Sequence, residues 1–88
     1  MLSAEEVAHR ALRQVRRLRI AGQRGPFVIR CGQGAAQTLE SMSFIESDCS
    51  VFVCAIPGKH AEKFDIEQLG EGMPVPKGAV ELRYEVNR

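Results

Sequence analysis

Aromatic residues are scarce in this chain, which has no tryptophan, a single tyrosine and four phenylalanines. A buried core must therefore consist mainly of aliphatic side chains. The 88 residues are enough for one such core but not for two, because small chains bury a limited share of their surface. We expect residues 1–88 to form a single small globular domain.

Long hydrophobic runs are also absent. The longest unbroken run, residues 51–56, is far shorter than the ~18 residues that a membrane-spanning helix needs. Near the N-terminus, Glu5 and Glu6 interrupt the apolar stretch that a secretory signal would require. We therefore expect no association with a membrane.

Paired cysteines are missing as well. The chain has three cysteines, Cys31, Cys49 and Cys54, and no CxxC motif, so they do not outline a disulfide framework. Unpaired cysteines are typical of a reducing compartment, and we expect a cytoplasmic protein. With His60, the cysteines could supply four zinc ligands, but their spacing lacks the close pair of structural zinc sites. We expect no metal and no other cofactor.

A glycine-containing loop raises the question of a ligand site. In residues 28–37, VIRCGQGAAQ, Cys31 ends an expected strand, and Gly32 and Gly34 precede an expected helix. Phosphate-binding loops share this order, but Gln37 stands where the dinucleotide fingerprint has its third glycine. The same glutamine stands where a tyrosine-phosphatase-like loop needs arginine. A turn is the favoured interpretation, and we name no catalytic residue. A small enzyme or ligand-binding domain centred on Cys31, Gly32 and Gly34 remains an alternative.

The pattern of apolar residues predicts an α+β fold. Ser3 and Glu6 form a capping box at the start of a helix, and Gly22 is placed to end it. Apolar residues at helical spacing predict helices over residues 4–21, 33–42 and 59–69, and runs or alternation of apolar residues predict strands over 27–31, 50–56 and 79–87. The last strand is expected at an edge. We expect a small sheet of three or four strands, with an N-terminal amphipathic helix and one or two shorter helices packed mainly on one face.

Positive charge is concentrated at the start of the chain. Residues 1–32 contain seven arginines and two glutamates, whereas residues 33–88 carry a net charge of −4. Four arginines lie on the side of the first expected helix that faces away from its apolar residues: Arg10, Arg13, Arg16 and Arg17. Like charges held close together repel one another unless an anionic group neutralises them. We therefore expect these four arginines to bind a partner.

The favoured interpretation is a non-enzymatic interaction or accessory protein. It presents the basic helix face to an acidic protein or, by self-association, to the acidic half of a second copy. Nucleic acid is the alternative, since arginine also binds phosphate. Against it stand a net charge of only +1 and the lack of aromatic residues beside the arginines. In a third interpretation, the arginines are simply the solvent-exposed side of an amphipathic helix, with no partner.

Overall fold

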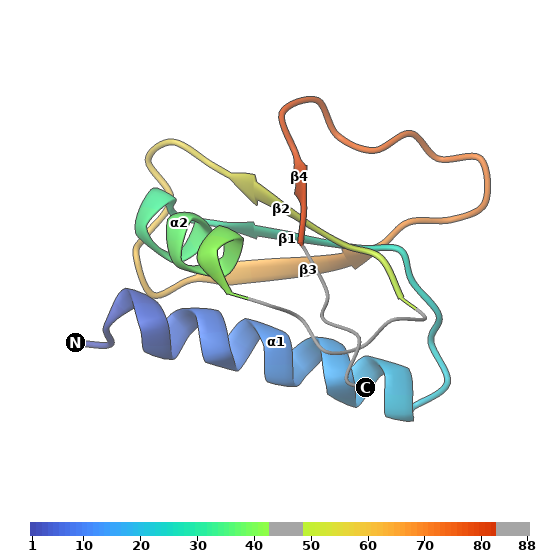
Figure 1. Cartoon of the computed structure of the whole chain (residues 1–88), viewed down its shortest axis with the longest axis horizontal. Helices are drawn as coiled ribbons and strands as arrows, with labels where there is room; N and C mark the ends of the chain where they lie inside the picture. The colour runs from blue at the N-terminus through green and yellow to red at the C-terminus, as the bar shows by residue number, and fades with distance from the viewer. Residues whose placement is uncertain (43–48, 83–88) are drawn as a thin grey trace.

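The computed structural model describes residues 1–42 and 49–82. The elements follow one another as α1 (Ala4–Ile20), β1 (Phe27–Cys31), α2 (Gln33–Ser41), β2 (Val51–Ala55), β3 (Phe64–Gln68) and β4 (Val80–Glu81). The strands form one four-stranded sheet in the order β3-β1-β2-β4, with β1 and β2 parallel and both edge strands antiparallel to their neighbours. The predicted α+β class and small sheet are confirmed, as is the edge position of the last strand (Figure 1).

The N-terminal helix begins and ends close to where the sequence predicts. The Ser3 hydroxyl accepts a hydrogen bond from the backbone N–H of Glu6 at 3.1 Å. The Glu6 carboxylate differs from the capping-box expectation, because it accepts from the Ser3 hydroxyl at 3.3 Å instead of from the Ser3 amide. Gly22 follows the helix with a φ of 94°, a conformation that glycine adopts without a steric penalty.

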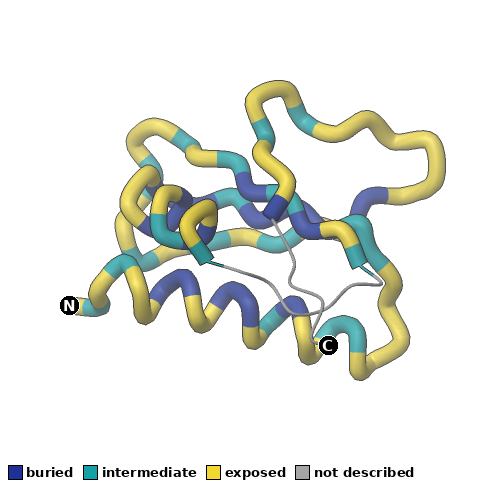
Figure 2. The backbone as a smooth tube through the Cα atoms, viewed as in Figure 1, coloured by how far each residue is buried: buried dark blue, intermediate teal, exposed yellow. Residues whose placement is uncertain are grey.

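The core lies between the sheet and the two helices, which cover the same face (Figures 1 and 2). On this face β1 contributes Phe27, Ile29 and Cys31, each no more than 1% exposed, to the buried cluster. Leu39 of α2 is fully buried in the same cluster. Phe27 is the one aromatic side chain in the buried cluster of the described residues, in keeping with the aliphatic core that the composition predicts. Parallel strands need a crossover between them, and α2 lies in the β1–β2 connection.

The predicted helix over residues 59–69 is wrong, because this segment contains turns followed by strand β3. Phe64 and Ile66 pack against the core, whereas the exposed Asp65 and Glu67 alternate with them. Alternation with a period of two residues is that of a strand. β3 pairs with β1 along its whole length, and this ladder outweighs the helical spacing of a few apolar residues.

The connection from β3 to β4 joins the two edges of the sheet and passes the side away from α1 (Figure 1). On that side Val28 is fully buried and Leu69 is 5% exposed. The predicted strand over residues 79–87 is confirmed for Val80–Glu81, and its last part, residues 83–87, lies outside the described residues. Within the described ranges, neither helix combines the length and hydropathy required to cross a membrane.

Candidate partner-binding surface

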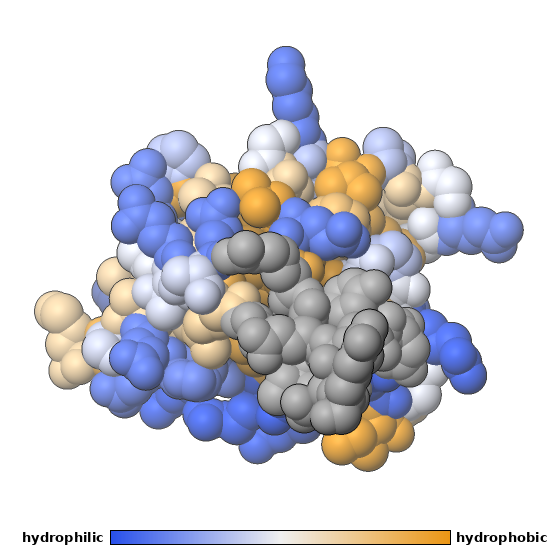
Figure 3. All heavy atoms as spheres, viewed as in Figure 1, coloured by the Kyte–Doolittle hydropathy of each residue, from blue (hydrophilic) through white to orange (hydrophobic). Residues whose placement is uncertain are grey.

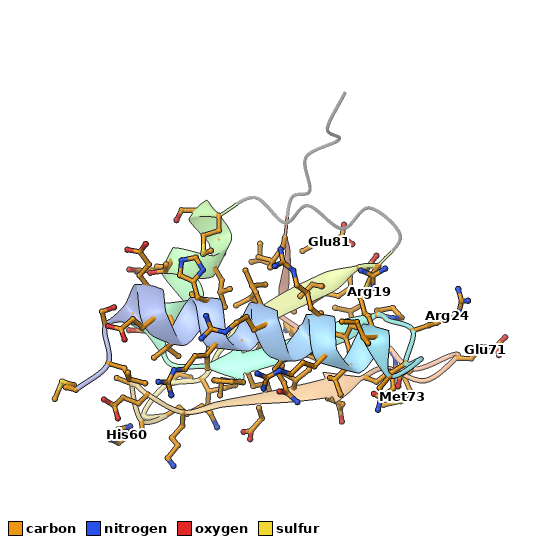
Figure 4. All side chains as sticks on the ribbon, turned by 90° about the horizontal axis from the view of Figure 1, so that it is seen from below. Arg19, Arg24, His60, Glu71, Met73 and Glu81 are labelled. Carbon is orange, nitrogen blue, oxygen red and sulfur yellow. The ribbon has the colours of Figure 1, made fainter. Side chains whose placement is uncertain are left out.

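A shallow hollow of about 360 Å³ lies between the polar side of α1 and strand β3. Arg10, Arg13, Gln14 and Arg17 line it from the helix, and Phe64 lines it from the strand. Helix residues that are three, four and seven positions apart lie on the same side, so α1 presents the three arginines as one stripe. β3 runs alongside α1 (Figures 1 and 4), which brings Phe64 to this stripe. We call this surface the arginine hollow.

The arginines of the hollow are exposed and carry uncompensated charge. Among the residues that the structure describes, Arg10, Arg13 and Arg17 form no ion pair. Hydrophilic side chains form the left and middle parts of the lower border of the molecule in Figure 3, where Figure 1 places α1, and a hydrophobic group lies at the right end of that border. Three guanidinium groups that repel one another in this way favour the approach of an anion.

The acidic residues of β3 do not neutralise the hollow, because they belong to the other face of the sheet. The Asp65 carboxylate accepts a hydrogen bond from the Lys59 ammonium at 2.6 Å, and Glu67 pairs with Arg30 at 3.1 Å. The hydrogen bond from Lys59, followed by its charge, lowers the pKa of Asp65 below its ordinary value. Each carboxylate therefore has its own cation, and the arginine hollow keeps its positive charge.

Arg16 is not part of the hollow. The sequence places it on the same broad polar face as the other three arginines, and it is exposed. In the structure Arg10, Arg13 and Arg17 line the hollow, whereas Arg16 takes part in an interaction of its own. The structure therefore brings together three of the four predicted partner-binding residues.

Sequence reasoning missed two residues of the hollow, namely Gln14 on the helix itself and, from another element, Phe64. The helix predicted over residues 59–69 separated it from the arginines, although the Phe-Asp-Ile-Glu alternation could have identified a strand there. Its ring packs against the core and also lines the hollow. An aromatic side chain therefore does lie beside the arginines, and its supposed absence no longer counts against nucleic acid.

Cys31, the central residue of the glycine-loop alternative, faces the core. It is 1% exposed, and burial, with a smaller contribution from Cys54, raises its pKa from 9.0 to about 11. A thiol reacts as a nucleophile through its thiolate form. At neutral pH the folded protein keeps this thiol protonated. The burial and the raised pKa of Cys31 therefore do not support a nucleophilic role.

At the start of α2, Gly32 lies in close contact with a neighbouring loop, whereas Gly34 does not. Gly32 is the N-cap residue, and a Cβ on it would lie 3.3 Å from the Lys59 carbonyl oxygen. A Cβ on Gly34 would be in ordinary contact with the Ala4 side chain at 3.6 Å. Close approach of the neighbouring loop accounts for Gly32 without a ligand, and Cys31, Gly32 and Gly34 line neither of the two hollows described here.

The second hollow, of about 180 Å³, follows the end of α1. It is lined by Arg19, Gly22, Gln23, Arg24, Gly25 and Cys49. Arg19 and Cys49 each take part in interactions of their own, so this surface has less free charge than the arginine hollow. Arg24 points away from the body of the domain (Figure 4).

The residues considered as zinc ligands do not converge. In the described part of the chain, no group of three or more histidine, cysteine, aspartate and glutamate side chains is arranged to hold a metal ion. His60 instead accepts a hydrogen bond from the backbone N–H of Glu62 through Nδ1 at 3.1 Å.

Comparison of the chain with protein-family models, curated proteins and solved structures finds no match. The geometry and charge of the arginine hollow are therefore the observations that bear on function.

Proposed function

We propose that this protein is a small cytoplasmic, non-enzymatic interaction protein that binds an acidic region of a partner protein through the arginine hollow. The observation that carries the proposal is that Arg10, Arg13 and Arg17 line one surface and form no ion pair among the described residues. Guanidinium groups bind carboxylates in a planar, two-pronged geometry. A segment that carries several carboxylates would therefore satisfy all three arginines.

The size of the hollow and the overall charge favour a protein partner over nucleic acid. Arg10 and Arg17 are separated by about 10 Å along the helix axis, which limits the number of phosphates that the stripe can neutralise. The net charge of the whole chain is only +1, so long-range attraction to the densely charged backbone of a nucleic acid is weak.

Single-stranded nucleic acid is the second candidate, and the position of Phe64 supports it. Proteins that bind single strands combine basic residues with aromatic rings on which bases stack. Phe64 lies beside three arginines, although its ring is also engaged with the core.

The test is a fluorescence anisotropy titration with labelled polyglutamate, single-stranded DNA and double-stranded DNA at about 50 and 200 mM salt. Arg13→Gln/Arg17→Gln removes two charges from the hollow, and Arg24→Gln/Lys77→Gln removes two exposed charges that lie outside it. We expect polyglutamate to bind, to bind more weakly at the higher salt concentration, and to lose at least about tenfold in affinity with the first variant only.

Two results would change this account. No binding of polyglutamate at the lower salt concentration, or an equal loss with both variants, would overturn the proposal. Tighter binding of single-stranded DNA that also depends on Arg13 and Arg17 would replace it with the second candidate.

A further inference from the structure

Strand β3 has one edge that pairs with no other strand in residues 1–42 and 49–82, and this edge lies next to the arginine hollow. The sheet order places β3 at an edge, with β1 on its other side. The backbone N–H of Leu69 donates to the Pro26 carbonyl at 2.8 Å, and the register pairs Asp65 with Arg30 and Glu67 with Val28. In an antiparallel ladder, alternate residues direct both backbone groups towards the same neighbour. Asp65, Glu67 and Leu69 therefore bond towards β1.

The remaining residues of β3 direct their backbone groups outwards. By the same alternation, these are Phe64, Ile66 and Gln68. Among the described residues, no backbone hydrogen bond outside the β1 ladder involves them. β3 also contains no proline, which is one of the devices that block strand addition at an edge. Its edge can therefore accept another strand.

The outward-facing residues are also the ones whose side chains point to the α1 side of the sheet. Phe64 and Ile66 pack against the core on that side, and Phe64 lines the arginine hollow. A strand added to β3 would place every second side chain on this same side, beneath Arg10, Arg13 and Arg17. The edge strand and the hollow thus share Phe64.

We propose that β3 accepts an extended acidic segment of a partner protein as an additional antiparallel strand, with its acidic side chains in the arginine hollow. This inference rests on the proposed function and specifies the form in which the acidic region binds. Strand addition supplies affinity through backbone hydrogen bonds, and the neighbouring side chains supply specificity.

The added strand would meet different charges on its two faces, and these charges determine which residues fit at alternate positions of its sequence. Alternate residues of an antiparallel strand are about 6.8 Å apart, so the arginine stripe, about 10 Å long, matches two or three alternate acidic residues. The side chains between them would lie beside Asp65 and Glu67, which already carry negative charge. Like charges on neighbouring strands are destabilising. The segment should therefore alternate acidic residues with neutral or basic ones.

A second copy of this chain does not fit the same edge. Antiparallel pairing of β3 with its own copy would place both α1 helices on one side of the joined sheet. The two stripes formed by Arg10, Arg13 and Arg17 would then approach each other, and like charges oppose this arrangement. An acidic segment from another protein meets no such repulsion.

The test uses peptides of identical composition. One alternates glutamate and threonine, and the other has the glutamates and threonines in separate blocks. The alternating peptide should bind at least about tenfold more tightly, because only it places every glutamate on the α1 side while pairing with β3.

Two N-methylated forms of the alternating peptide, one methylated at the glutamate amides and one at the threonine amides, provide a matched pair. Methylation of the glutamate amides, which face β3 in the antiparallel register, should weaken binding about tenfold, whereas methylation of the threonine amides should not.

Amide hydrogen exchange of the protein gives a second readout. The N–H groups of Phe64 and Ile66 should exchange more slowly when the alternating peptide is bound, because they gain hydrogen-bond partners. The N–H groups of Asp65 and Glu67 already bond to β1 and should change less.

The outcomes separate this inference from the proposed function. Equal, arginine-dependent binding of both peptides, or indifference to the methylated positions, would overturn strand addition and leave the proposed function standing. A larger loss with the threonine amides methylated would overturn the antiparallel register. No binding of either peptide or of polyglutamate would overturn both proposals, and preferential binding of single-stranded DNA would support the second candidate function instead.

Discussion

Arg13, in the middle of α1, and Phe64, at the start of β3, line the same surface hollow. The pairing of β3 with β1 produces this relationship, because it places β3 alongside α1 (Figure 1). β3 borders only part of the basic face of α1. Arg10, Arg13 and Arg17 line the hollow together with Phe64 of this strand, whereas Arg16 does not.

Replacement of Phe64 by leucine distinguishes the two candidate partners. Phe64→Leu keeps an apolar side chain against the core but removes the aromatic ring. We expect the affinity for polyglutamate to stay within about twofold, because carboxylates bind the guanidinium groups and not the ring. A loss greater than about tenfold for single-stranded DNA, measured in the same anisotropy assay, would instead show that bases stack on Phe64.

The Lys59–Asp65 pair predicts a specific change in the pKa of Asp65. Lys59 lowers this pKa through its hydrogen bond and charge, so Lys59→Met should raise it towards the ordinary value. A folded-state pKa that is depressed contributes stability above the ordinary pKa, and this contribution is lost as the pH falls through the folded-state pKa. Carboxylate titration by NMR should show the change in Lys59→Met and not in the control Lys77→Met. An unchanged pKa in Lys59→Met would show that the pair does not persist in solution.

Cys31 should be unreactive in the folded protein at neutral pH. Its pKa of about 11 leaves very little thiolate, and its side chain is buried, so iodoacetamide should modify it only after unfolding. The raised pKa also implies stability that is complete below the ordinary value of 9.0 and is lost as the pH rises towards about 11. The decline of the unfolding free energy over this range should be smaller in Cys31→Ala. Rapid modification of Cys31 in the native protein at pH about 7, detected by peptide mass spectrometry, would return the nucleophile interpretation to consideration.

Leu39 should be essential for holding α2 on the sheet. It is fully buried in the core cluster, and truncation of such a residue leaves a cavity that typically costs about 2–5 kcal/mol. Leu39→Ala should therefore lower the free energy of unfolding by this amount in urea denaturation. Gln37→Ala, at an exposed position on the same helix, should change it by less than about 0.5 kcal/mol. Similar values for the two variants would show that α2 is not packed as described.

Local signals in the sequence were sufficient to predict α1 and the chemistry of its outer face. The Ser3 cap, the buried apolar side and Gly22 act within the helix itself, so the position of α1 follows from residues that are close in sequence. The same periodicity identified Arg10, Arg13 and Arg17 as neighbours. It places these three within about 60° around the helix, with Arg16 alongside. It does not give the element beside them, so it could not show that a hollow forms at these three arginines and not at Arg16.

The edge strand and its part in the candidate surface could not be predicted in the same way. β3 forms because its backbone pairs with β1, which is distant in sequence, and the pairing outweighs the local preference of residues 59–69. With this segment assigned to a helix, Phe64 had no predicted relationship to α1. The free edge of β3 depends on the strand order, which composition and periodicity do not determine.

The most direct test of the central claim is to locate acidic-polypeptide binding on the protein by ¹⁵N NMR. On addition of polyglutamate, the account predicts that the largest backbone amide shift changes cluster at Arg10, Arg13, Gln14, Arg17 and Phe64, the residues that line the arginine hollow. Changes centred on Arg24 and the second hollow, or the absence of changes at low salt, would contradict it.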